Sequence, residues 1–388
     1  MNKVEELIQE LCPDGVEFKE LQEITYLRAG DRIIKSMMNN TFSYKVYGGG
    51  TTPTGSYTDY NFENSITIAR AGSAGFVNWV DEKFWATDVC FVASQKDNDV
   101  LIKFVYYFVK SKQNDLQNHL YGASMPKLNK NYLWKLKIPI PPLSVQEEII
   151  KILDNFAELE AELEAELEAR KKQYEHYKNE LLTFEDDVEW KPMGEVGQFV
   201  RGNGLPKTDF TETGIGCIHY GQIYTYYGTY TDKTKSFVSV ETAKKLQKVQ
   251  KNDLIITNTS ENIEDVCKAV VWLGDDEIVT GGHASIFKHR ENPKYLAYYT
   301  QTKMFFAEKK KLAKGTKVTD VSAKDLAKIR IPIPSIKEQE RIVAILDKLD
   351  ALVNDISKGL PAEINARRKQ YEYYREKLLT FKEKALVV

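Results

Sequence analysis

The chain reads Leu136-Lys-Ile-Pro-Ile-Pro-Pro142 near its middle and Ile329-Arg-Ile-Pro-Ile-Pro-Ser335 near its end. Each run leads into a segment with helical apolar spacing. The two segments close on the matching tails Arg170-Lys-Lys-Gln-Tyr174 and Arg367-Arg-Lys-Gln-Tyr371. A long internal repeat sets the architecture before any other signal, because each copy must form the same kind of unit. The sequence therefore predicts two modules in succession, each followed by a long helix.

The Ile-Pro-Ile-Pro runs determine where the helices begin. Proline fixes φ, lacks a backbone donor and keeps the preceding residue out of the α region, so each run is extended. Ser144 followed by Glu147 fits the capping-box pattern of a helix N-terminus, and Ser335 followed by Glu338 repeats it. We expect both helices to start in the same way.

Both helical segments are long and amphipathic. The first is expected to span about 38 residues, or about 57 Å. The second should break at Gly359 and Pro361 and resume over residues 362–381. Helices of this length bury an apolar stripe best against each other, so we expect an antiparallel, coiled-coil-like spacer. The residues expected in the helix-helix contact are Ile152, Phe156, Leu159, Leu163, Leu167, Ile345, Leu349, Leu352 and Ile356.

The non-repeated regions show a different pattern. Residues 39–85 and 198–289 alternate β-favouring residues with turn signals, whereas residues 101–118 and 292–312 have helical spacing. The expected fold class is α+β, with two mixed, mostly-β domains related by an internal pseudo-two-fold repeat. Each domain is followed by one of the two packed helices.

Composition excludes several classes of protein. At 388 residues the chain exceeds one ordinary domain, and 42% hydrophobic with 28% charged residues is typical of a soluble protein. No apolar run approaches the roughly 20 residues of a membrane span, and residues 1–11 are amphipathic rather than a signal peptide. Four separated cysteines favour buried thiols. We expect a cytoplasmic protein without a membrane role.

Charge is distributed unevenly. The formal net charge is −2, but residues 133–192 carry 15 acids and 8 bases, whereas residues 193–324 carry 15 acids and 19 bases. The excess negative charge therefore lies on the first repeated helix. The second module can present a basic surface to nucleic acid, while the first module, over residues 14–132, is neutral.

The motifs of enzymes that act on DNA are missing from the sequence. There is no glycine-rich cofactor loop with an Asn-Pro-Pro-aromatic motif for base methylation, and no phosphate loop for ATP. Asp14 and Glu17 lie too close along one segment for a nuclease metal site, and the five histidines are scattered. The glutamates of residues 158–168 fit a solvated helix face better than a cation site. We expect no catalytic residue, metal or cofactor on this chain.

Two variable modules, each followed by Ile-Pro-Ile-Pro-x-x-x-x-Gln-Glu and later by Lys-Gln-Tyr-x-x-Tyr, resemble the DNA-specificity subunit of a type I restriction-modification system. The match covers essentially the whole chain. Gly72-Ser-Ala-Gly-Phe76 and Gly122-Ala-Ser-Met-Pro-Lys-Leu128 are typical of the family's loops, whereas the second module departs from them with Gly315-Thr-Lys-Val-Thr-Asp320.

The resemblance implies a non-catalytic subunit whose two target-recognition domains each read half of a bipartite site in double-stranded DNA. It implies further that the helices set the spacer and dock two methyltransferase subunits, joined by two restriction subunits in the full complex. S-adenosylmethionine, ATP and Mg²⁺ then belong to those partners.

On this basis the chain divides into four segments. Residues 1–132 and 186–325 are the two target-recognition domains, and residues 133–185 and 326–388 are the central and distal helical regions. The second module is 21 residues longer than the first, measured from Lys19 to Ile138 and from Lys191 to Ile331, so we expect an asymmetric target. Polar and basic loop residues are the expected DNA contacts: Arg28, Arg70, Ser73, Ser124, Lys127, Asn129, Arg201, Asn203, Lys207, Asn258, Ser260, Lys314 and Lys317.

The helical regions differ by four residues, because the offset between the repeats is 193 at Gln146 and Gln339 but 197 at Gln173 and Gln370. Three Ala-Glu-Leu-Glu units occupy residues 157–168, where a fourth would restore equality. One more unit would lengthen the helix by about 6 Å and turn it by about 40° beyond a full turn. One base pair corresponds to about 3.4 Å and 35°. The spacer between half-sites should therefore grow by one or two base pairs.

Two other interpretations stay open. A coiled-coil scaffold that binds other proteins would interact with them independently of salt, whereas phosphate contacts make DNA binding salt-dependent. An autonomous type II-like enzyme is the second, and the missing catalytic motifs argue against it.

Overall fold

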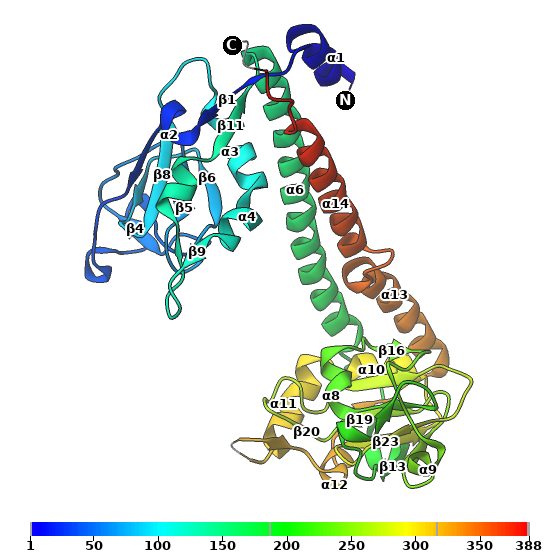
Figure 1. Ribbon diagram of the computed structural model, residues 1–388. Helices are drawn as coiled ribbons and strands as arrows, with labels where there is room; N and C mark the ends of the chain where they lie inside the picture. Colours follow the sequence, from blue (N-terminus) through cyan, green and yellow to red (C-terminus); the bar gives the residue numbers. More distant parts are fainter. Residues whose placement is uncertain (1, 186–187, 316, 386–388) are drawn as a thin grey trace. The chain divides into compact units, whose positions relative to one another are not determined.

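The computed structural model describes residues 2–185, 188–315 and 317–385, and the chain divides into two compact units (Figure 1). The first contains Met1–Ala165 and Glu363–Val388, and the second contains Glu166–Ala362. The four segments expected from the sequence divide the chain differently, and their boundaries stay a prediction. The boundary at 185/186 falls on residues outside the described ranges. In the described part of the chain, no helix is long and apolar enough to cross a membrane.

Two sheets form the body of the first unit. The antiparallel sheet has four strands in the order β2 (Thr25–Ala29), β8 (Cys90–Gln95), β5 (Ser65–Ala69) and β6 (Val77–Val80). The other has three, β4 (Gly55–Tyr57), β3 (Tyr44–Tyr47) and β7 (Phe84–Ala86), with β3 and β7 parallel. Every residue of β5 is buried, so this strand lies at the centre of the core.

Helices and a hairpin complete the first unit. Helix α3 (Ile102–Ser111) packs on β5 and β6 and leads into α4 (Gln113–Asn118). A hairpin of β9 (Leu120–Tyr121) and β10 (Lys127–Leu128) follows, as Figure 1 shows. The remaining short elements are α1 (Asn2–Leu11), α2 (Leu21–Ile24), the 3-10 turn η1 (Lys35–Met37) and α5 (Lys130–Trp134).

The second unit is built on two five-stranded sheets. The first has the order β13 (Gly197–Arg201), β23 (Ala284–His289), β19 (Leu254–Thr257), β21 (Ala269–Trp272) and β16 (Tyr230–Thr231). The second has the order β14 (Phe210–Thr211), β17 (Ser236–Val238), β15 (Ile215–Ile218), β22 (Ile278–Thr280) and β18 (Gln247–Val249). The smaller elements are α7 (Met193–Val196), η2 (Lys207–Asp209), α8 (Tyr220–Thr225), α9 (Val240–Ala243), β20 (Thr259–Ser260), α10 (Pro293–Tyr299), α11 (Lys303–Leu312), β24 (Thr319–Asp320) and α12 (Ala323–Leu326).

The two units share one topology, which confirms the predicted repeat. The order β13-β23-β19-β21 matches β2-β8-β5-β6, and the parallel pair β15 and β22 matches β3 and β7. Strands β16, β14 and β18 are additions that extend the sheets of the second unit. Part of the greater length of the second module therefore lies in additional strands at the edges of its sheets.

The Ile-Pro-Ile-Pro runs are strands, as expected. Strand β11 (Lys137–Ile140) pairs with the entry strand β1 (Glu17–Glu20), and β25 (Arg330–Pro332) pairs in the same way with β12 (Trp190–Pro192). Each module therefore begins and ends on one two-stranded ribbon, directly before its helix.

Three helices make up the repeated segments. Helix α6 (Leu143–Leu181) has 39 residues, which confirms the predicted length. The second segment is interrupted as expected, into α13 (Ile336–Asn354) and α14 (Leu360–Leu378). The two helices begin at equivalent positions of the repeat, because Leu143 and Ile336 are separated by the offset of 193. The predicted capping by Ser144 is wrong, since Ser144 lies inside α6 and Pro142 holds the place of the cap, whereas the hydroxyl of Ser335 caps α13 by accepting the N–H of Glu338 at 3.3 Å.

Within each unit the helices pack antiparallel. In the first unit the Phe156 ring stacks on the Tyr374 ring with centroids 5.7 Å apart, and Arg368 forms ion pairs with Glu160 and Glu164. The numbering runs in opposite directions along α6 and α14, which fixes their relative sense. In the second unit Leu167 and Leu349 pack against the same buried cluster.

The helix-helix prediction is wrong at two positions. Ile356 is 83% exposed because α13 has already ended at Asn354, so this side chain lies in the break and not on a helical stripe. Leu352 is 36% exposed at the end of the same helix. The other predicted residues are partly buried, and Ile152 and Leu167 pack directly against the cores of their units.

The break also changes the interpretation of the four-residue difference. The offset between the repeats is 193 up to the end of α13 and 197 in α14, so the surplus residues lie in the connection of residues 355–359. They form one isolated turn, in which the N–H of Gly359 donates to the carbonyl oxygen of Asp355 at 2.9 Å, and they extend neither helix. The first helix is therefore not missing a unit that the second one has.

Candidate nucleic-acid interface

Each module is held on its helix by a buried glutamine at the same repeat position. The Gln146 side chain accepts the N–H of Leu101 at 2.8 Å and donates to the carbonyl oxygens of Asp99 and Pro141 at 3.0 and 2.7 Å. Gln339 accepts the N–H of Asn292 at 2.9 Å in the same way. Both glutamines are fully buried.

An aspartate two turns further on makes a second matching contact. Asp154 on α6 accepts hydrogen bonds from Lys103 and Tyr107 of α3, and Asp347 on α13 accepts them from Lys294 and Tyr298 of α10. Burial raises the pKa of the Tyr107 and Tyr298 hydroxyls. Asp154 raises the pKa of Tyr107 further, and Asp350 and then Asp347 raise that of Tyr298, so both tyrosines stay neutral donors. The loops described below are thus presented on rigid supports.

In the first unit, the segment after β5 makes a turn that requires glycine. Gly72 has a φ of +80°, and a Cβ on it would lie 2.6 Å from the carbonyl oxygen of Gly49. The N–H of Ser73 donates to that same oxygen at 2.7 Å. The Gly-Ser-Ala-Gly run therefore holds two loops together.

The β9–β10 hairpin is attached to this turn. Lys127 forms a β-bridge with Ala71, and the N–H of Leu128 donates to the carbonyl oxygen of Arg70 at 2.9 Å. The structure thus gathers Arg70, Ser73 and Lys127, three of the predicted contacts, around one turn. Ser124 is exposed on the same hairpin.

The two other predicted residues of the first module interact within their own unit. Arg28 on β2 lies over the Phe62 ring at 4.3 Å from its centroid and 3.5 Å from the Asp31 carboxylate. Asn129 caps α5 by accepting the N–H groups of Asn131 and Tyr132 at 3.0 and 3.3 Å. The guanidinium of Arg28 stays exposed, whereas the side chain of Asn129 serves as the N-cap of α5.

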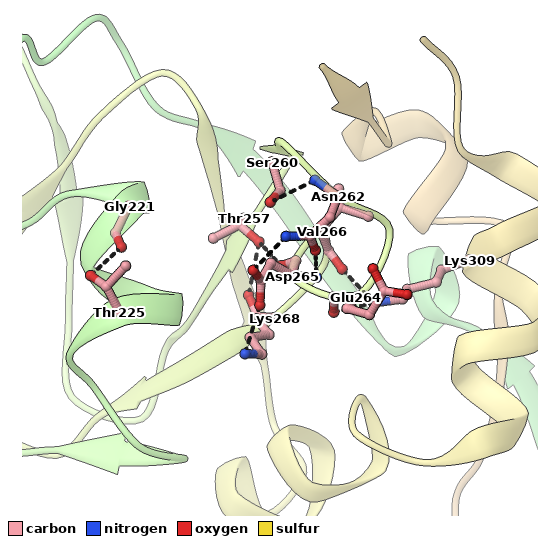
Figure 2. Close-up of polar contacts among 10 residues, drawn as sticks. All are labelled: Gly221, Thr225, Thr257, Ser260, Asn262, Glu264, Asp265, Val266, Lys268 and Lys309. Carbon is pink, nitrogen blue, oxygen red and sulfur yellow. Dashed lines mark hydrogen bonds and ion pairs between the residues drawn. The ribbon is translucent and has the colours of Figure 1, made fainter. Parts of the chain in front are cut away.

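The segment after β19 holds the equivalent place in the second unit (Figure 2). The Asp265 carboxylate accepts a hydrogen bond from the Asn262 side chain at 2.9 Å and pairs with Lys268 at 2.8 Å. Burial opposes ionisation of Asp265, but the hydrogen bonds from Lys268 and Asn262 outweigh it and lower its pKa. The loop is closed by its own side chains.

Lys309 of α11 fixes this loop from the interior. Its ammonium donates to the carbonyl oxygens of Glu264 and Val266 at 3.0 and 2.6 Å (Figure 2). Only 4% of Lys309 is exposed, and burial lowers its pKa. This lysine is therefore a support for the loop rather than a surface cation.

Asn258 and Ser260 are buried, contrary to the expectation of exposed DNA contacts. Asn258 donates to the carbonyl oxygen of Val321 at 2.8 Å and accepts the hydroxyl of Ser285 at 2.7 Å. The Ser260 hydroxyl accepts the N–H of Asn262 at 3.4 Å. These residues were expected in an exposed loop, but Thr259 and Ser260 form β20, which pairs with β24, and the whole Asn-Thr-Ser run is buried. Their polar groups are bound inside the second unit and do not face solvent.

Arg201 and Asn203 lie at the end of β13, beside the glycine pair Gly281-Gly282, and Lys207 follows at the start of η2. Asn203 bridges to Gly281 and donates to the carbonyl oxygen of Lys245 at 2.5 Å. The Arg201 guanidinium donates to the carbonyl oxygen of Gly282 at 3.4 Å. All three predicted side chains are exposed.

Lys314 and Lys317 lie on the hairpin that corresponds to β9 and β10. Lys314 donates to the Asp325 carboxylate at 3.2 Å, yet 75% of its side chain is exposed. Hydrogen bonds from Lys328, Ser322 and Lys314 lower the pKa of Asp325. Lys317 is exposed as well.

Several of these cations are free to meet an anion. Among the described residues, Arg70, Lys127, Arg201, Lys207 and Lys317 make no ion pair, in contrast to Arg28 and Lys314. Unpaired cations on several exposed loops are what phosphate binding requires. The described residues contain no group of three or more His, Cys, Asp or Glu side chains placed to hold a metal ion.

An aromatic group in the second unit was not anticipated. The Tyr220 ring lies between His219 and His283, with centroids 4.4 and 4.8 Å away, and His283 is exposed. Burial, followed by Lys207 and His283, lowers the pKa of His219 to about 4, and its Nδ1 accepts the N–H of Gly221 at 3.1 Å. The tyrosine-rich stretch of residues 220–230 was the available signal.

The chain was compared with known proteins. The family model for the type I restriction modification DNA specificity domain matches residues 13–169 and again residues 185–366. A type I restriction enzyme specificity subunit of Escherichia coli, EcoR124I/EcoR124II, is 32% identical over 94% of this chain and 89% of its own length. A putative specificity subunit from Haemophilus influenzae is also 32% identical, over 94% of this chain and 96% of its own.

A solved structure shares the fold. The S subunit of a type I restriction-modification system from M. genitalium superposes with a TM-score of 0.60 at 19% sequence identity, over 94% of this chain and 96% of that one.

Proposed function

The chain belongs to the family of type I restriction-modification DNA specificity proteins, and from this premise we propose how it selects DNA. Each unit reads one half of a bipartite site in double-stranded DNA. The two halves differ, because the second unit carries the additional edge strands β14, β16 and β18 and its own aromatic group around Tyr220. The target is therefore asymmetric.

The observation that carries this proposal is that the repeat extends to the loops. In both units the segment after the central strand, β5 or β19, pairs with a hairpin that precedes the last short helix. Exposed lysines or arginines lie on these paired loops or close to them. A duplicated arrangement of this kind fits two half-sites of one duplex better than one continuous site.

The partners supply the chemistry. Helices α6, α13 and α14 set the distance between the half-sites and dock two methyltransferase subunits, and two restriction subunits join the full complex. S-adenosylmethionine, ATP and Mg²⁺ are bound by those subunits, and this chain is a non-catalytic subunit of a cytoplasmic complex. The E. coli relative bears the name of a specificity subunit of a restriction enzyme, which supports this assignment.

Co-expression tests the proposal directly. The chain is produced with the methyltransferase of its own system, and modified adenines are mapped by single-molecule sequencing. We expect a bipartite, asymmetric motif that disappears when this chain is omitted. Association with the methyltransferase without chain-dependent methylation, or salt-insensitive binding to an unrelated protein, would contradict it and favour the scaffold.

A further inference from the structure

The tip of the β9–β10 hairpin carries a large apolar side chain in water. Met125 is 65% exposed and Tyr121 is 54% exposed, and Pro126 beside them is exposed too. Gly122 opens the tip with a φ of +93°, and a Cβ there would lie 3.0 Å from the carbonyl oxygen of Met125. The tip is a shaped turn, and its apolar residues contribute to no core.

The base of the hairpin is fixed, so the tip is presented rigidly. Leu128 is 1% exposed in the core of the unit, and Lys127 is bridged to Ala71. The His119 ring stacks on the Tyr132 ring, with centroids 3.7 Å apart and planes 7° from parallel. Figure 1 shows the hairpin extending away from the sheets of the first unit.

The second unit repeats this feature with a different sequence. Gly315 has a φ of +98°, and Val318, three residues later, is 55% exposed. Gly122 and Met125 have the same spacing. A left-handed glycine followed by an exposed apolar side chain is therefore a property of the hairpin position and not an accident of one loop.

The surroundings of Met125 point to DNA. Lys127 lies at the base of the hairpin, and Arg70 lies on the segment that pairs with this base. Neither makes an ion pair among the described residues, so both can hold phosphates beside the hairpin. One apolar residue flanked by cations is far too small for a protein interface, which needs about 800 Å² on each partner. Methionine and proline are among the side chains that DNA-binding proteins insert between base steps.

We propose that Met125 enters the first half-site as an apolar wedge at a base step, and that Val318 takes the equivalent place in the second half-site. The wedge rests on the proposed function, since it needs the half-sites to be bound. The wedge adds a sequence preference at a base step that the protein does not read through hydrogen bonds. Base steps that unstack at low cost, such as pyrimidine-purine steps, accept the inserted side chain best.

The test uses the complex of the full chain with its methyltransferase and a duplex carrying the mapped target. The adenine analogue 2-aminopurine is placed at positions of the first half-site other than the methylated base, because the enzyme itself flips that base. Its fluorescence reports unstacking. The variants are Met125→Ala and Met125→Leu, with Met304→Ala, which is 39% exposed on α11 of the second unit, as a control.

With the unaltered chain, binding should raise the fluorescence at one step. Met125→Ala should abolish that rise and weaken binding by about tenfold, Met125→Leu should restore both, and Met304→Ala should change neither. The slope of affinity against salt should stay the same, because no phosphate contact is lost. A rise that persists in Met125→Ala, or a loss of affinity accompanied by a lower salt slope, would overturn the wedge. Failure of the unaltered complex to bind the bipartite site would instead overturn the proposed function.

Discussion

At the scale of residues, the repeated glutamine on each helix has a role that its sequence position alone did not reveal. Gln146 lies at the start of α6, fully buried, and satisfies three backbone groups of the first module. Its counterpart Gln339 accepts the N–H of Asn292 and donates to the carbonyl oxygen of Pro334 and to the Glu291 carboxylate. A buried polar group left without its partner costs about 1–3 kcal/mol, so these side chains join module to helix.

Gln146→Ala should therefore lower the stability of the first unit by about 3 kcal/mol, because two carbonyl oxygens and one N–H lose their partner. Hydrogen exchange followed by mass spectrometry measures the two units separately. Protection should fall in the first unit only, whereas Gln339→Ala should reduce it in the second. Gln370→Ala, at an exposed position on α14, is the control and should stay within about 0.5 kcal/mol. An equal loss in both units would contradict this prediction.

His219 should make the second unit sensitive to acid. Burial, then Lys207 and His283, lowers its pKa from 6.5 to about 4, so the folded state resists a proton that the unfolded state accepts. The contribution of neutral His219 to the free energy of unfolding is fully present above pH 6.5. It is lost as the pH falls from 6.5 toward 4, and the total loss is about 3 kcal/mol.

His219→Asn tests this, because asparagine can still accept the N–H of Gly221 but does not titrate. The second unit of this variant should lose less stability between pH 6.5 and 4 in urea titrations. His176→Gln, at an exposed histidine on α6, should not alter the pH profile. An unchanged profile in His219→Asn would show that other groups govern the acid sensitivity.

At the scale of elements, the helices are held together by apolar and aromatic packing at their ends and by exposed charges between them. Phe156 stacks on Tyr374, whereas Arg368 meets Glu160 and Glu164 with about half of its side chain exposed. Exposed ion pairs contribute about 0–1 kcal/mol. The Ala-Glu-Leu-Glu stretch should therefore tolerate a change in length better than the helix ends.

Insertion of a fourth Ala-Glu-Leu-Glu unit after Glu168 should lengthen the spacer of the target by one or two base pairs. The helix gains about 6 Å and turns by about 40° beyond a full turn. Methylome sequencing of a strain that carries the insertion gives the new motif, with both half-sites expected to be unchanged. Persistent methylation with the original spacer would refute the prediction.

At the scale of the whole molecule, the duplicated topology predicts that the half-sites can be altered independently. Arg70→Ala in the first unit and Arg201→Ala in the second each remove one exposed or partly exposed cation without an ion pair among the described residues. Each variant should weaken DNA binding and lower the salt slope by about 1 if its arginine contacts a phosphate. Any relaxed base preference should appear in one half of the motif only, as methylome sequencing can show. Loss of preference in both halves from a single variant would contradict independent modules.

The sequence alone determined the repeat, the strand-helix junctions and the break in the second helix. These features follow from local rules, because proline restricts the backbone and apolar spacing sets the helix face. It also located the glycine turn at Ser73 and the cations Arg70, Lys127 and Lys207, of which Lys207 is exposed and the other two are partly buried, since loop chemistry is readable from residue type.

Only the tertiary structure decided which polar residues are exposed. Asn258 and Ser260 look like turn residues, but their neighbours β24 and Ser285 come from distant segments and bury them. Ile356 fits the apolar spacing of a helix in the sequence, but α13 ends at Asn354, before this residue is reached. The exposure of Met125 could not be predicted from the sequence either, because it depends on which parts of the chain fold against the side chain, and one sequence pattern fits a core or a surface equally well.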